Sequence, residues 1–259
     1  MSTCVSDFLD DFDTRWNEVN ILIQMASEMD DNSAEFEVLC RGAIILMVAN
    51  FEGFLTETIK CLIKDVNENR YFVNTSTRMK MTFCSQFIPE EKGVERRVNK
   101  LIETFDEVNP KYSIEPFLYE NNKNPKALVI EKLFSELGGK NFFSHIANCD
   151  VEKVFENDSQ FTNSFIEKTK NILQNGVIDF PYNIDVAEVG FNDGKEKVSG
   201  SCLWKDFINR TLQARHSVAH GLSQESSMSL PEIKSTRDKI KILELTFAIL
   251  ALDVAIVNT

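Results

Sequence analysis

Residues 34–68 read AEFEVLCRGAIILMVANFEGFLTETIKCLIKDVNE, and this stretch predicts one long helix. Ser33 precedes the stretch as an N-cap, four residues before Glu37 and ahead of an apolar run. Between Ile44 and Leu55 the apolar side chains fall on several faces of the helix at once, which is typical of a helix surrounded by others. We therefore expect residues 34–68 to form the central helix of the core.

Two charged residues interrupt one apolar stripe of this helix. The stripe has three- and four-residue spacing and reads Arg41, Ile45, Val48, Glu52, Leu55, Ile59. A position near the helix end explains Arg41, but Glu52 has apolar neighbours one turn away in both directions. A carboxylate there is costly to bury alone. We expect Glu52 to have a cation or a proton as its partner.

Further helices are predicted outward from this stretch, with proline, glycine and asparagine breakers between them. They cover residues 5–29, 77–87, 93–108, 126–137, 160–174, 202–219 and 237–257. Residues 177–189 look extended, although Pro181 restricts them to an edge or an irregular segment. Only 10 Gly and 6 Pro occur in 259 residues. The predicted fold class is all-α.

The last predicted helix is apolar on more than one face. Two parallel rows begin at Ile240 and Ile242, and a third row holds Ala248, Ala251 and Ala255. One packed face cannot use all three rows. Two interpretations remain open, a central core helix and a helix that also lines a subunit interface.

Composition excludes several classes of protein. A net charge of −12 argues against a protein whose whole surface binds nucleic acid, but it is compatible with one local basic site. The longest apolar stretches, residues 43–49 and 245–252, are far below the roughly 20 residues that cross a bilayer, so no membrane contact is expected. The N-terminus, MSTCVSDFLDDFD, is acidic where a secretory signal would be positive. We expect a cytoplasmic protein.

The predicted helix at residues 202–219 belongs to the sequence LWKDFINRTLQARHSVAHG, residues 203–221. Trp204, Ile208 and Leu212 recur at helical spacing, and Arg215 falls on the same stripe. A guanidinium facing a core needs a carboxylate, and Glu52 is one. Either the two pair, or Arg215 extends to solvent and Glu52 lies at a groove. Periodicity leaves both open.

Two histidines follow Arg215 on a different face of the helix. His216 and His220 are four residues apart, about 40° around a helix, whereas Arg215 and His220 differ by about 140°. Gly221 predicts that the helix stops at His220, which lets that imidazole leave the helical register. No third ligand accompanies the two histidines, and the six cysteines are scattered, so neither a metal site nor a cofactor is expected.

The segment Arg215-His216-Ser217-Val218-Ala219-His220-Gly221 resembles the R-x4-6-H signature of HEPN domains, in which a polar residue follows the arginine. The order of elements is also similar: a long apolar helix with Phe51-Glu52-Gly53-Phe54, the signature helix, and an apolar C-terminal helix. The chain most resembles the RiboL-PSP and MAE-type groups of bacterial defence islands. The resemblance covers residues 1–70 and 200–259. It implies one HEPN-like helical bundle, residues 1–259, in which residues 71–199 are a mostly helical insertion or elaboration.

This resemblance implies a metal-independent endoribonuclease that acts on RNA as a homodimer, with the arginine and histidine of both subunits facing one cleft. His220 would be the base or acid, and Arg215 would stabilise the phosphate charge. His216 would be an auxiliary polar contact, and Glu52 would orient Arg215. Lys205 and Arg210 would contact RNA phosphates.

The same resemblance implies a biological setting and two rival functions. The setting is a toxin or effector of a prokaryotic defence or toxin–antitoxin system, with a cognate antitoxin or defence-system protein as a further partner. One rival is a non-catalytic HEPN module that binds RNA or a partner protein, since many proteins of this fold lack activity and the chain is acidic. The other is a purely structural dimerisation domain. The intact Arg215 and His220 pair favours catalysis.

Overall fold

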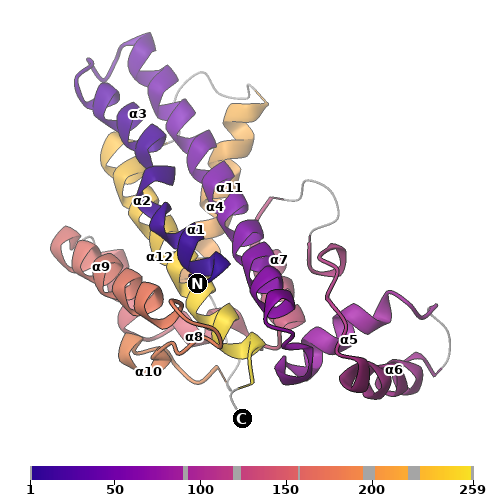
Figure 1. Ribbon diagram of the computed structural model, residues 1–259. Helices are drawn as coiled ribbons and strands as arrows, with labels where there is room; N and C mark the ends of the chain where they lie inside the picture. Colours follow the sequence, from indigo (N-terminus) through magenta and orange to yellow (C-terminus); the bar gives the residue numbers. More distant parts are fainter. Residues whose placement is uncertain are drawn as a thin grey trace.

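The computed structural model describes residues 2–89, 93–118, 124–156, 158–194, 202–220 and 228–257. These residues form a bundle of helices (Figure 1), and within them the bridge between Thr75 and Ile256 is the only β contact. The all-α prediction is confirmed. The α-helices are α1 (Cys4–Asp10), α2 (Phe12–Arg15), α3 (Asn17–Ser27), α4 (Ala34–Glu68), α5 (Thr77–Ser85), α6 (Val94–Val108), α7 (Ala127–Leu137), α8 (Phe142–Ile146), α9 (Ser159–Gly176), α10 (Val186–Val189), α11 (Leu203–Ala219) and α12 (Leu230–Ala255). Short 3-10 helices are η1 (Phe72–Asn74), η2 (Glu115–Phe117) and η3 (Asp150–Glu156).

Helix α4 is the centre of the bundle, as predicted. The Ser33 hydroxyl accepts a hydrogen bond from the Phe36 N–H at 3.1 Å, so the predicted cap begins the helix. Helices α1, α3, α11 and α12 all pack against α4. By length and composition α4 could cross a membrane, with a mean hydropathy of 1.7 over 18 residues. Of that window, 44% is buried inside the bundle.

Helix α12 lies alongside α4 and is buried over most of its length. It begins at Leu230, before the predicted start at residue 237, because Ser229 and Glu232 form a reciprocal capping box. Every residue from 242 to 252 is buried, since α3, α4, α7 and α9 surround the helix. Both apolar rows and the alanine row are therefore covered within one chain. The core-helix interpretation is confirmed, and only Val254 and Val257, at the end of the first row, stay partly exposed.

The predicted helix at residues 5–29 is divided into α1, α2 and α3. Asp11 and Trp16 lie at the two breaks. The backbone of Asp11 departs from helical geometry, whereas that of Trp16 stays in the right-handed helical region. The apolar stripe nevertheless continues across the breaks, because Leu9, Phe12 and Trp16 are all buried. The periodicity predicted the buried face correctly and missed the breaks.

The middle of the chain packs onto the core helices. Helices α7 and α9 both contact α12, and α5 and α6 extend the bundle beyond the end of α4 (Figure 1). The predictions for α5, α6, α7 and α9 agree with the structure to within a few residues. Helix α8 was not predicted, and residues 177–189 form an irregular segment that ends in α10.

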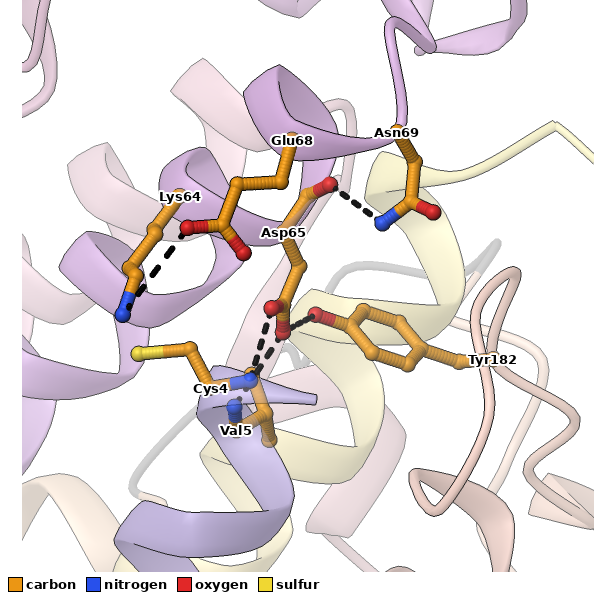
Figure 2. A network of polar contacts seen from close by, with 7 residues as sticks. All are labelled: Cys4, Val5, Lys64, Asp65, Glu68, Asn69 and Tyr182. Atoms are coloured by element: carbon orange, nitrogen blue, oxygen red, sulfur yellow. Dashed lines mark hydrogen bonds and ion pairs between the residues drawn. The ribbon is translucent and has the colours of Figure 1, made fainter. Parts of the chain in front are cut away.

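Asp65 joins three distant parts of the chain (Figure 2). Its carboxylate accepts hydrogen bonds from the backbone N–H groups of Cys4 and Val5, at 2.7 and 3.1 Å, and from the Tyr182 hydroxyl at 2.7 Å. It therefore caps α1 from the side of α4. Burial, and then the charge of Asp65, raise the pKa of Tyr182 well above its usual value. The network fixes the N-terminal helix and residues 177–182 against the end of α4.

Asp65→Asn is expected to lower the free energy of unfolding by about 2–4 kcal/mol, because the amide loses the charge that three donors share and turns an N–H towards one of them. Urea unfolding at pH 7 measures this change. Glu68→Gln is the matched control one turn nearby, since its exposed carboxylate reaches only Lys64 at 4.0 Å. A loss no larger for Asp65→Asn than for Glu68→Gln would contradict the capping role.

Candidate functional site

The candidate site residues lie on helix α11, which packs against α4. Trp204, Ile208 and Leu212 are buried, so the predicted core-facing stripe is confirmed. The helix ends at Ala219 with His220 as its C-cap, where the prediction placed the end. Gly221, which suggested that end, lies outside the described residues.

The two histidines form a pair on the exposed side of this helix end. Their ring centroids are 4.2 Å apart with an interplanar angle of 53°. The His220 N–H still donates to the His216 carbonyl at 3.1 Å, as in a continuing helix. The imidazole of His220 therefore stays above that of His216. The prediction that it leaves the helical register is wrong.

Arg215 lies on another side of the same turn. It is half-buried and continues the stripe of Leu212 towards the core, whereas both histidines are exposed. A helix separates Arg215 from His216 by about 100°, and from His220 by about 140°. Within the described residues no hydrogen bond or ion pair occupies the Arg215 guanidinium. The guanidinium faces a different direction from the imidazoles of its own chain.

Glu52 does not pair with Arg215. It is half-buried on α4, between the buried Phe51 and Phe54, and no cation of the described chain comes within 4.0 Å of its carboxylate. Partial exposure explains this, because a hydrated charge at the edge of a core needs no internal partner. Arg215 is half-buried instead of extending to solvent, so the structure matches neither interpretation fully. The role of Glu52 in orienting Arg215 has no contact to support it.

The two predicted phosphate contacts point to different places. Lys205 lies over the Phe143 ring, at 5.2 Å from its centroid, and 3.7 Å from the Glu131 carboxylate. It therefore faces α7 and α8. Arg210 is exposed and lines a cavity of about 960 Å³ that also reaches Ser217, beside the histidines. Only Arg210 lies on a hollow surface that adjoins the histidine pair.

The buried carboxylate that sequence reasoning missed is Glu244 on α12. It is 1% exposed, its Oε2 accepts from Trp16 Nε1 at 3.1 Å, and its Oε1 has no partner within the described chain. Burial raises the pKa of Glu244 to about 8. A signal was present, because Glu244 begins the row that continues as Ala248, Ala251 and Ala255. No three His, Cys, Asp or Glu side chains converge as a metal site among the residues with described positions.

A helical bundle whose second-last long helix ends in R-x4-H defines a HEPN domain. Within that superfamily the chain belongs to the RiboL-PSP-HEPN family, which it matches over residues 10–250. This match also includes residues 71–199, which the motif-based resemblance did not cover. No curated protein and no solved structure matches the chain. Membership of this superfamily indicates an RNase-type or RNA-related function.

Proposed function

We propose that the protein is a metal-independent endoribonuclease of HEPN type. The observation that carries the proposal is the end of α11, where the exposed His216 and His220 pair stands beside an Arg215 guanidinium that no described carboxylate neutralises. Among the described residues no carboxylate forms an ion pair with any of these three basic side chains. A site for the RNA backbone uses all three.

The chemistry follows from the residue types. His220 removes the proton of a ribose 2′-hydroxyl, and the freed 2′-oxygen attacks the adjacent phosphorus. The bond from phosphorus to the 5′-oxygen breaks, and that oxygen leaves with a proton. The products carry a 2′,3′-cyclic phosphate and a 5′-hydroxyl. Arg215 stabilises the extra negative charge on the pentacoordinate phosphate, and His216 makes an auxiliary polar contact.

Two copies of the chain would complete this site. Since Arg215 and the imidazoles face different sides of α11, one copy can supply the base while the other supplies the guanidinium. The end of the bundle formed by α3 and the start of α4 offers apolar contact area, because Ile21 is 56% and Val38 is 58% exposed.

The protein is expected to have twice the 29.6 kDa mass of the chain in solution. Light scattering at micromolar concentration measures this mass. Ile21→Lys combined with Val38→Lys should give the single-chain mass if the α3 and α4 surface joins the copies. A single-chain mass for the unsubstituted protein would remove the two-copy cleft.

Cleavage of purified total RNA in EDTA tests the activity itself. Fragments that end in 2′,3′-cyclic phosphate are the expected result. The second candidate function is a non-catalytic module that binds RNA or a partner protein. The separate directions of Arg215 and His220 within one chain favour it. Intact RNA that the protein nevertheless retains on a filter would support this second function and contradict the first.

In the cell, we propose that the protein is a cytoplasmic toxin or effector in a prokaryotic defence or toxin–antitoxin system, held inactive by a cognate antitoxin or defence-system protein. Family membership supports this setting. Expression in bacteria should arrest growth, and the arrest should require His220.

A further inference from the structure

The cavity beside the histidines is built from three parts of the chain. One wall is α11, through Arg210, Gln213 and Ser217, and the second is the first half of α12, through Lys234, Ser235 and Lys239. The third part adds the apolar Val154 and Phe155 from η3 and the hydroxyl side chains of Ser159 and Thr162 from α9. At about 960 Å³ the cavity is larger than a single ion needs and accommodates a nucleotide-sized ligand.

Two cations that line this cavity are Arg210 and Lys239. The charge of Glu232 acts on Arg210 and that of Asp238 on Lys239, but neither carboxylate forms an ion pair with either cation in the described chain. The Lys239 ammonium lies over the Phe155 ring at 4.9 Å, and it donates to the Ser235 hydroxyl at 2.8 Å, so both of these partners are neutral. Burial, and then the charge of Arg210, lower the pKa of Lys239. Arg210 has no ion-pair partner within the described chain. The two positive groups repel each other across the cavity.

The two acidic residues of the lining have other partners. Glu232 accepts hydrogen bonds from the N–H and the hydroxyl of Ser229, at 2.8 and 2.7 Å, in the capping box of α12. Asp238 accepts from the Arg237 guanidinium at 2.8 Å. Neither carboxylate is within 4.0 Å of Arg210 or Lys239 in the described part of the chain. An entering anion would therefore relieve the repulsion between the cations.

We propose that this cavity is a nucleotide subsite for the RNA strand, in which Arg210 and Lys239 hold one phosphate and the side chains of Val154, Phe155 and Phe207 face the attached nucleoside. The inference rests on the proposed function and extends it to a substrate-binding surface. Arg210 precedes His216 by six residues on α11, roughly 9 Å along a helix axis. An RNA strand bound in this cavity would reach the histidine pair within a few nucleotides of the bound phosphate.

Binding of a short labelled RNA whose 2′-hydroxyls are replaced by hydrogens tests the subsite, because this probe cannot be cleaved. Fluorescence anisotropy at several salt concentrations gives the affinity and its salt dependence. Each phosphate contact with a single strand contributes about 0.7 to the slope of log affinity against log salt. The Arg210→Gln, Lys239→Met double variant removes both groups that hold this one phosphate, so it should lower the slope by about 0.7 and weaken binding at least tenfold in low salt.

Lys132→Gln is the matched control, because Lys132 is 71% exposed on α7 and lies outside the cavity. It should leave both affinity and slope unchanged. Arg210→Gln alone alters only an exposed side chain, and Lys239→Met keeps an unbranched side chain of similar length beside Phe155, so both should keep the wild-type melting temperature. A double variant with the slope and affinity of the wild type would overturn the subsite.

Competition and cleavage distinguish an RNA-strand subsite from a free-nucleotide site and from the nuclease activity. Displacement of the probe by micromolar adenosine monophosphate would overturn the RNA-strand assignment in favour of a free nucleotide ligand, whereas no displacement supports the strand. Cleavage assays on unmodified RNA report separately on the proposed function. A protein that binds the probe through Arg210 and Lys239 but never cleaves RNA would refute the nuclease and retain the subsite. A protein that cleaves RNA, but whose affinity for the probe is unchanged in the double variant, would refute the subsite and support the nuclease.

Discussion

His220→Ala is expected to lower the rate of RNA cleavage by about 100- to 10,000-fold, the range that positioned acid–base groups contribute. Arg215→Ala is expected to cost about 100- to 1,000-fold, the effect of removing a group that stabilises transition-state charge. His220 is exposed at the end of α11, and Arg215 is half-buried there without an ion pair in the described chain, so both variants should stay folded. Initial rates on a labelled RNA in EDTA, with circular dichroism of each variant, measure the effect.

Arg215→Lys and His216→Ala refine this result. Lysine keeps the charge but loses the planar fork that can hold two phosphate oxygens, so most of the activity should be lost. His216→Ala should lose less than His220→Ala, because His216 is assigned only an auxiliary contact. Wild-type rates in His220→Ala would refute the mechanism. Activity that disappears with chelator would instead indicate a metal held by the two histidines.

Glu244→Gln is expected to stabilise the protein at high pH by several kcal/mol. The pKa of Glu244 is about 8 in the fold, against 4.5 for an ordinary glutamate. Below about pH 4.5 both states are protonated. As pH rises further, the unfolded chain loses its proton first, so stability falls between pH 4.5 and 8, by up to ~5 kcal/mol. The glutamine side chain does not ionise in this pH range, and its amide oxygen can still accept a hydrogen bond from Trp16 Nε1.

Urea unfolding at pH 5, 7 and 9 separates this effect from a general change in packing. The difference in unfolding free energy between Glu244→Gln and wild type should be small at pH 5 and largest at pH 9. Glu103→Gln on the exposed side of α6 is the control, with a change below about 0.5 kcal/mol at each pH. A Glu244→Gln difference that does not vary with pH would show that the carboxyl is not buried in its protonated form.

Local signals in the sequence predicted the elements well. Ser33 and the apolar run after it fixed α4 at Ala34–Glu68, and the stripe of Trp204, Ile208 and Leu212 fixed the inner face of α11. The start of α12 was missed, because the polar residues before Arg237 resemble a loop unless Ser229 and Glu232 are read as a capping box.

Contacts between elements were harder to predict. Periodicity places Glu52 and Arg215 on inner faces of their helices, but it gives neither the depth of each side chain nor the level at which two helices meet. Both are half-exposed, and no ion pair joins them. Glu244 was not predicted as a buried carboxylate, because Glu52 on α4 was the charged residue expected in the core. Glu244 is far more buried and lies between two apolar rows of α12.

The position of α12 has a consequence for how the protein is made. The helix that fills the middle of the bundle is encoded after all the others, so α4 lacks one of its largest neighbours until the ribosome has passed residue 255. Before then the nascent chain exposes apolar surface that chaperones can bind, and no partial product holds a finished core. A chain interrupted before α12 should be degraded rather than active. For a protein proposed to cut RNA, this order of synthesis delays activity until α12 has been made and packed.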